Sequence, residues 1–330
     1  MKSLEAFKDE LLDFFTQLDW KHWTKLGVSG RERAGNQVNV DPEALILLTG
    51  FLGERDLRLI HNAAGWLVTN PHLVHKARLK KIIDVDHDRT VANLGKIFHY
   101  TSGATDNSYW GTMEDYCAKL RCFRNEEGFK EGDKSSVDLQ ARDYKVVKAD
   151  RENNRMILRT LFGTTVRAEL FNFFFGGGSG NSKSIAEYTQ LSQSTVHTIL
   201  NELVTIGLID KRGRSRSTSY EIVKGDFNLE RLRPEIYFDW ANYVKSIVKA
   251  WNQLETLSEP DSEYKTRSAL RQFAFSFRDN LSDWNAKLVD NSVSKSIQAK
   301  DFMEKEEAAE DLSALVKQLP TRAARGGFGE

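Results

Sequence analysis

The chain has 330 residues, and its 47 lysines and arginines are balanced by 47 aspartates and glutamates, which makes the formal net charge zero. This length allows two or three domains at about 100–200 residues each. A hydrophobic share of 40% and a charged share of 28% are ordinary for globular proteins, and only 5 prolines argue against a disordered or fibrous chain. Zero net charge excludes a uniformly basic nucleic-acid coat, but it allows a local basic patch.

No apolar run approaches the roughly 20 residues that a membrane-spanning helix needs. The most apolar stretch, 168–175, already contains Glu169 and Asn172, and the first residues run into acids, unlike a secretory signal. Two cysteines, Cys117 and Cys122, are too few for a disulfide framework or a four-thiolate zinc site. We therefore expect a reduced, cytoplasmic protein with no membrane partner and no cofactor.

The first 150 residues predict a helical domain and indicate no particular activity. Apolar residues spaced three and four apart from Leu4 to Leu18 mark one face of a first helix. Asp41 followed by Pro42 has the form of a helix start, with a capping acid and then proline in the first turn. Further helices are expected at 55–68, 72–83 and 91–100, with loops at 29–39 and 101–110.

The expected boundaries divide the chain into four parts: 1–150, 151–226, 227–295 and 296–330. A charged stretch at 142–154 forms the first linker. Two long helices at 234–257 and 262–289 carry aromatic stripes, which are most simply core, although part of one could be a dimer seam. The last part contains an acidic run and is expected to be mobile.

The segment 155–225 predicts three helices followed by a β-hairpin. The helices are expected at 164–175, 183–190 and 193–206, with a loop at 176–182. Ser192 is suited to cap the third helix, and Gly207 to end it in the left-handed conformation. The inward positions of the third helix are Val196, Leu200, Leu203 and Val204.

The outward face of the third helix carries short, uncharged polar side chains, and only Glu202 lies at its flank. Base edges in the major groove are read by such donors and acceptors, whereas acids are repelled by phosphate. Ordinary solvent-facing helices are instead dense in Lys and Glu. The residues expected to read bases are Gln193, Ser194, Thr195, His197, Thr198 and Asn201.

The hairpin that follows gathers positive charge at its tip. Segment 155–225 holds nine cations and five acids, a net of +4 in a neutral chain. Cations on a hairpin with Gly and Ser between them can lie along phosphates or enter a minor groove. The residues expected to hold the DNA backbone or minor groove are Lys183, Lys211, Arg212, Arg214 and Arg216.

These residues resemble the winged helix-turn-helix domains of bacterial transcriptional regulators of the MarR and ArsR kinds. The likeness covers about 70 residues and rests on 185–187, 191–196, Leu200, Leu203, 206–209 and the basic hairpin. Gln190 departs from the pattern, because such turns often carry glycine. The resemblance implies a mainly α fold with a central winged helix-turn-helix, sequence-specific binding of double-stranded DNA, and a homodimer that meets two half-sites.

Other interpretations stay open beside DNA binding. Winged helices also serve as protein docking modules, so an antitoxin-like or defence-associated partner protein is an alternative. Residues 177–184 nearly spell a phosphate-binding loop, but Ser182 replaces the glycine before the lysine.

The first 150 residues also contain side chains of the kinds that bind metals. A small metal-dependent enzyme, such as a nuclease, could use Asp84, Asp86 and Asp88, and His72 and His75 are a similar pair. Helix capping is the simpler interpretation of both groups, so we expect no catalytic or metal site. Cys117 and Cys122 with His99 could form a thiol switch, although buried free cysteines are the simpler interpretation.

Overall fold

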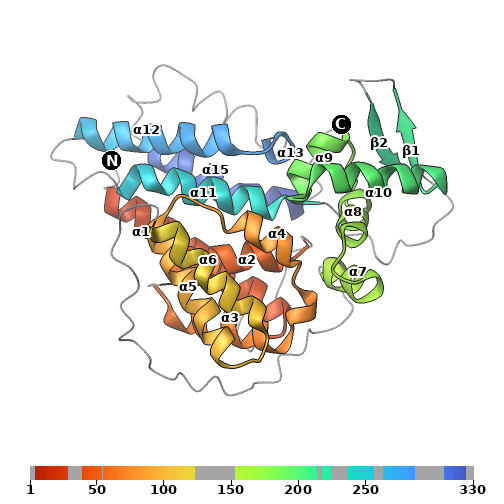
Figure 1. The fold of residues 1–330 in the computed structure, drawn as a ribbon. Coiled ribbons are helices and arrows are strands. Elements are labelled where there is room, and N and C mark those ends of the chain that lie inside the picture. The colour runs from red at the N-terminus through yellow and green to blue at the C-terminus, as the bar shows by residue number, and fades with distance from the viewer. Residues whose placement is uncertain are drawn as a thin grey trace.

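The computed structural model of the chain describes residues 4–28, 39–53, 55–122, 153–213, 218–223, 237–255, 263–286 and 308–324. Within these ranges helices dominate, and two antiparallel strands form the only sheet. A larger helical body carries a smaller unit, residues 153–223, at one end (Figure 1). None of the helices in the described part of the chain is long and apolar enough to cross a bilayer.

The body is built from helices of both the N-terminal and C-terminal regions. Its elements are α1 (Leu4–Lys25), α2 (Pro42–Leu52), α3 (Leu57–Thr69), η1 (Pro71–Leu73), α4 (Lys76–Ile82), α5 (Asp88–Gly103), α6 (Ser108–Cys122), α11 (Trp240–Glu255), α12 (Glu263–Asn280), α13 (Asp283–Ala286) and α15 (Ala308–Ala324). Every residue of α2 is buried, because α1, α3, α4, α5 and α11 all pack against it. A helix this apolar on all sides is stable only when neighbours cover each face, and α2 is therefore the central helix of the body.

Side chains cap several helices of the body, and α2 begins where the sequence predicts a start. Asp41 caps α2 by accepting the N–H of Ala44 at 3.2 Å, and Pro42 takes the first helical position. His75 caps α4 and His87 caps α5, each through its ring nitrogen Nδ1. The helices predicted at 55–68, 72–83 and 91–100 correspond to α3, to η1 with α4, and to α5.

The predicted loop at 101–110 was wrong over most of its length. Helix α5 continues to Gly103 and α6 begins at Ser108, which leaves a short connection between them. The spacing of apolar residues did not predict α6, because only a narrow stripe of this helix is buried, namely Trp110, Met113 and Cys117. Polar residues on the other faces of α6 obscure the helical period.

The C-terminal helices share one hydrophobic core with the N-terminal helices, so the predicted separate domain at 227–295 was wrong. Phe273 of α12 packs edge-on against Phe7 of α1 at 5.8 Å between ring centroids. Tyr243 of α11 lies edge-on to Phe15 at 6.5 Å. The aromatic stripe considered as a dimer seam is thus covered, over the described residues of α11 and α12, by the body itself.

The C-terminal elements also differ from their predicted bounds. Helix α11 begins at Trp240, six residues after the predicted start. The helix predicted at 262–289 is interrupted after Asn280, where Asn242 accepts the N–H of Ser282 at 2.6 Å and donates to the Asn280 carbonyl at 2.8 Å. Part of the tail predicted to be mobile forms α15, whose buried residues are Leu312, Ser313, Leu315, Val316, Leu319 and Pro320.

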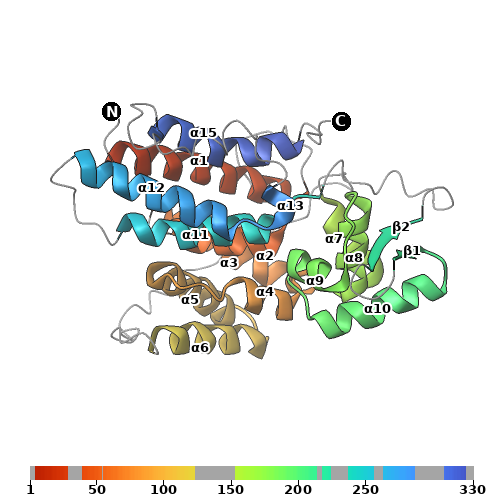
Figure 2. The same cartoon turned by 90° about the horizontal axis from the view of Figure 1, so that it is seen from above.

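The smaller unit has its own core and lies beside α4 of the body (Figure 2). Its elements are α7 (Asn154–Phe162), α8 (Val166–Phe175), α9 (Ser182–Thr189), α10 (Gln193–Thr205), β1 (Ile209–Arg212) and β2 (Ser219–Ile222). Three of these helices and the hairpin follow the predicted order, whereas α7 was not predicted. Val196, Leu200 and Leu203 point inward from α10 as expected, and Val204 is half-buried.

Candidate nucleic-acid interface

A tight turn joins α9 to α10. Gln190 closes α9 at φ 57°, and it is the one non-glycine residue with positive φ in the described part of the chain. At this position Gln190 adopts the left-handed conformation that glycine would favour. Its Nε2 donates to the Glu187 carbonyl at 2.8 Å, and the N–H of Leu191 donates to the Ala186 carbonyl at 2.9 Å. These bonds fix the direction in which α10 leaves the turn.

The outward face of α10 is polar and exposed. The six side chains predicted to read bases are all exposed: Gln193, Ser194, Thr195, His197, Thr198 and Asn201. Nδ2 of Asn201 lies 3.2 Å from Nε2 of His197, and the Thr198 hydroxyl donates to the Ser194 carbonyl at 3.1 Å. The flanking acid, Glu202, forms an ion pair with Arg167 of α8, which neutralises the one carboxylate that α10 carries.

Ser192 occupies the N-cap position of α10 as predicted, but its side chain makes no capping hydrogen bond. Its hydroxyl lies 2.9 Å from the hydroxyl of Ser194 instead. The first-turn N–H groups of α10 are therefore not satisfied by Ser192. At the other end, Gly207 has a φ of 74°, as expected for the residue that ends this helix.

The hairpin presents two faces of different charge. Lys211 pairs with Tyr220 across the strands, and Asp210 pairs with Glu221. Because side chains alternate along a strand, Lys211 and Tyr220 share the face turned toward α9 and α10, while Asp210 and Glu221 lie on the other. Arg212 lies on that second face and forms an ion pair with Glu221. Of the cations predicted on the hairpin, Lys211 is thus the described one that faces the helices.

The remaining predicted cations are placed as follows. Lys183 is exposed in the first turn of α9, and its Nζ lies 3.9 Å from the carboxylate of Glu187 one turn further on. This pair is almost fully exposed and contributes little. Arg214 and Arg216 lie outside the described residues.

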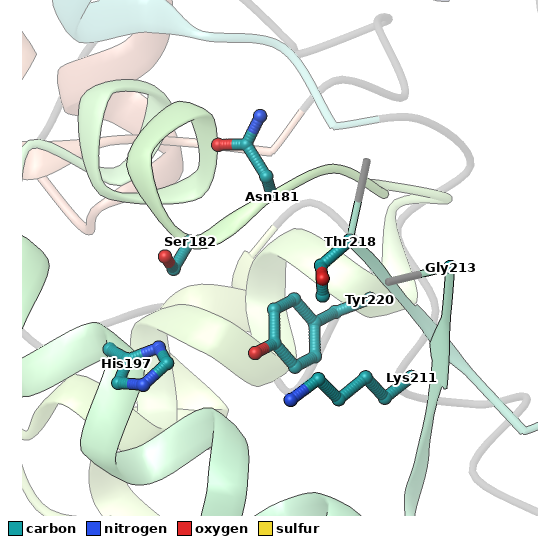
Figure 3. Close-up of a pocket in the computed structure, with 7 residues that line it drawn as sticks. All are labelled: Asn181, Ser182, His197, Lys211, Gly213, Thr218 and Tyr220. Carbon is teal, nitrogen blue, oxygen red and sulfur yellow. The ribbon is translucent and has the colours of Figure 1, made fainter. Parts of the chain in front are cut away.

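A hollow of about 490 Å³ separates the hairpin from the two helices (Figure 3). Asn181 and Ser182 enter it from the start of α9, His197 from α10, and Lys211 and Tyr220 from the hairpin. No carboxylate is among the described residues that line it. The hollow adjoins the outward face of α10, since His197 belongs to both.

The chain before α9 pairs with the hairpin as a third, very short strand. The N–H of Tyr220 donates to the Gly180 carbonyl at 2.8 Å, and the N–H of Gly180 donates back at 3.2 Å. Gly180 has a φ of 153°, which favours glycine at this position. The sequence indicated a plain loop at 176–182, and nothing in its pattern distinguishes this pairing.

A buried network of ion pairs joins the small unit to the body. From the body, Arg78 of α4 donates to Asp41 at 2.7 Å and to Glu43 at 2.6 Å, both in α2 or its cap. From the unit, Arg159 of α7 donates to Glu43 at 2.7 Å and to Glu169 of α8 at 2.7 Å. Arg155 completes the network, with Asp41 and Glu169 as its partners. All six side chains are buried.

The arginines keep Asp41 and Glu169 ionised in spite of burial. Burial alone would raise the pKa of Glu169, but Arg159, Arg155 and Arg78 lower it to about 2. Burial likewise opposes ionisation of Asp41, and Arg155 with Arg78 holds its pKa well below the usual range. Three arginines therefore face three acidic side chains in a buried site.

The body also holds the turn between α9 and α10. Nε of Arg78 donates to the Thr189 carbonyl at 2.9 Å, and Nζ of Lys81 donates to the Leu191 carbonyl at 3.2 Å. The hydroxyl of Tyr237 donates to the Tyr188 carbonyl at 2.7 Å. Sequence reasoning missed these contacts, because they join residues about 50 to 110 positions apart. Their effect is to fix α10 relative to the body.

Some of the side chains considered for other chemistry have structural roles. His75 and His87 cap helices, and the described residues contain no group of three His, Cys, Asp or Glu side chains that could hold a metal. In the segment resembling a phosphate-binding loop, Asn181 caps α9 by accepting the N–H groups of Lys183 and Ser184. Burial raises the pKa of the Cys117 thiol to about 12, which keeps it protonated.

Comparison of the chain with known proteins found no matching family model, no similar curated protein and no similar solved structure.

Proposed function

We propose that the chain is a sequence-specific double-stranded DNA-binding protein whose small unit is a winged helix-turn-helix, as in bacterial transcriptional regulators. The element order α8, α9, α10, β1, β2 supports this proposal, together with the short strand pairing at Gly180 before α9. In this assignment α9 and α10 are the helix-turn-helix, and the hairpin is the wing.

The observation that carries the proposal is the outward face of α10. It presents hydroxyl, amide and imidazole groups to solvent, and its flanking acid is already paired with Arg167. Such a helix can enter a major groove about 12 Å wide and offer donors and acceptors to base edges. Gln193 and Asn201 are suited to bidentate contact with adenine, and the hydroxyls to either kind of base.

Backbone contacts come from cations beside that face. Lys211 is exposed on the wing face turned toward α10, and Lys183 lies in the first turn of α9. These charges hold the backbone without reading sequence, and they make binding salt-dependent. Arg214 and Arg216 at the wing tip are proposed to extend this contact. A homodimer is proposed as well, because two recognition helices meet two half-sites about 34 Å apart.

Selection of bound duplexes from a random DNA pool tests the proposal directly. We expect the full chain to enrich one motif, a repeated half-site if the chain is a dimer, and to bind it at least about a thousandfold more tightly than unrelated DNA. Enrichment of no sequence, with no binding of any duplex at low salt, would exclude the proposal. Co-purification of a stoichiometric protein partner in that case would favour the docking alternative.

A further inference from the structure

The hollow beside α10 contains a buried tyrosine whose hydroxyl is not used within the described chain. Tyr220 is 2% exposed, and its ring belongs to the core of the small unit. Its backbone is held on both sides, by Lys211 in the hairpin and by Gly180 before α9. Its hydroxyl points into the hollow on the side of His197 (Figure 3), and no described group bonds to it. A phenylalanine would fill the same core, so packing does not explain the oxygen.

Other donors converge on the same space from separate elements. Nζ of Lys211 lies 6.0 Å from the centroid of the Tyr220 ring and points into the hollow in the same direction as the tyrosine hydroxyl. Ser182 lies at the first position of α9, where the helix dipole is positive. Asn181 accepts the N–H groups of Lys183 and Ser184, so the Ser182 hydroxyl is a donor left at this edge.

We propose that this hollow is a phosphate seat, in which the Tyr220 hydroxyl, the Lys211 ammonium and the Ser182 hydroxyl bind one phosphate group of the DNA backbone. The assignment of the phosphate to DNA rests on the proposed function. A phosphate is negatively charged and accepts several hydrogen bonds, which matches a hollow whose described lining residues include donors and no carboxylate. The hollow adjoins the face of α10 through His197, so a phosphate bound there would lie beside the groove that α10 reads.

The phosphate seat would set the position of α10 along the DNA groove and would not distinguish one base sequence from another. Tyr220 is tied to β1 and to the residue before α9, so its hydroxyl position is fixed by two backbone pairings. A phosphate held at such a point would set how far α10 slides along the groove. We expect the seat to strengthen binding to every sequence by the same factor, because it contacts no base.

The Tyr220→Phe variant tests the seat, since it removes one oxygen and keeps the ring in the core. We expect its affinity for any duplex to fall about tenfold, the loss of one hydrogen bond to a charged group. The salt dependence should stay unchanged, whereas Lys211→Met should lower the slope by about 0.9. Tyr264→Phe, at a tyrosine of α12 that is 75% exposed, is the matched control and should bind as the parent does.

Duplexes with one neutral methylphosphonate at each backbone position in turn locate the contact. At one position per half-site the parent should lose affinity while Tyr220→Phe loses nothing further, whereas at phosphates contacted by other cations both proteins should lose affinity equally. Affinity of Tyr220→Phe equal to that of the parent, or the same methylphosphonate penalty in both at every position, would overturn the seat while leaving DNA binding intact.

A separate arm uses inorganic phosphate and follows the His197 ring signals by NMR. If the parent binds no DNA but binds phosphate, and Tyr220→Phe does not, the seat is supported with free phosphate as its source and the proposed function fails. If the parent binds neither, both proposals are overturned.

Discussion

Glu43 has a different role in the structure from the one that its position in the sequence predicts. In the sequence it is an acid in the first turn of a helix, where it complements the helix dipole. In the structure it is fully buried, and it accepts hydrogen bonds from Arg78, Arg159 and the N–H of His75. The first-turn position was predictable from Pro42, but its partners lie 32 to 116 residues away along the chain. No local pattern contains that information.

We expect Glu43→Gln to destabilise the protein by about 3–5 kcal/mol. The substitution removes the carboxylate that pairs with Arg78 and Arg159, so three buried arginines then face only two carboxylates. Urea unfolding of the full chain measures this. Glu5→Gln is the matched control, since the side chain of Glu5 is 60% exposed and pairs with Lys8 at the surface. A loss of stability in Glu43→Gln no larger than in the control would contradict the assigned network.

At the scale of elements, α7 shows why some helices escape prediction. Its arginines, Arg155 and Arg159, point inward to the ion-pair network, whereas Leu161 and Phe162 are 61% and 44% exposed. This reverses the usual distribution of polar and apolar residues on a surface helix, so a pattern of apolar spacing cannot reveal it. Helices α1 and α10 follow the usual distribution. Helix α10 agrees closely with the predicted 193–206, and α1 begins at Leu4 as predicted but continues past Leu18 to Lys25.

The candidate site was predictable to a similar extent. The exposed face of α10 followed from the spacing of Val196, Leu200 and Leu203, because a helix that buries these must expose the residues between them. The contribution of Tyr220 was not predictable. Alternation along β2 indicates that it is buried, but only the packing against α9 and α10 shows where its hydroxyl points.

The start of α11 yields a prediction about pH. Asp239 precedes α11, accepts the N–H of Asn242 at 3.0 Å, and is buried, and burial raises its pKa to about 7. The folded protein therefore keeps this carboxyl protonated at pH values where the unfolded chain, with a pKa near 3.8, ionises it. The stabilisation from Asp239 is complete below about pH 4 and is lost as the pH rises through 7.

Asp239→Asn should remove this dependence, because the amide keeps an acceptor oxygen and does not titrate. We expect the urea midpoint of the parent, relative to that of the variant, to fall between pH 5 and pH 8. The comparison within one pair of proteins cancels the other titrating groups. If the urea midpoints of parent and variant differ by the same amount at pH 5 and at pH 8, the Asp239 carboxyl does not titrate in this range.

At the scale of the whole molecule, the small unit is joined to the body by complementary charge. The body contributes Asp41, Glu43 and Arg78 to the network, a net of −1, and the unit contributes Arg155, Arg159 and Glu169, a net of +1. Separation would leave an unbalanced charge on each side, and burying such a charge is costly. Arg78 and Lys81 also donate hydrogen bonds to backbone carbonyls of the turn before α10. The body therefore sets the orientation in which the outward face of α10 is presented.

The central claim is that this face reads bases, and the specificity ratio of Asn201→Ala tests it most directly. The ratio compares affinity for the selected duplex with affinity for a scrambled duplex at one salt concentration. We expect the ratio to fall about 5- to 150-fold, equivalent to about 1–3 kcal/mol for one base contact, with binding to scrambled DNA unchanged. Gln17→Ala, at an exposed polar residue of α1, should leave the ratio unchanged. An unchanged ratio in Asn201→Ala, and likewise in Gln193→Ala, would contradict base reading by α10.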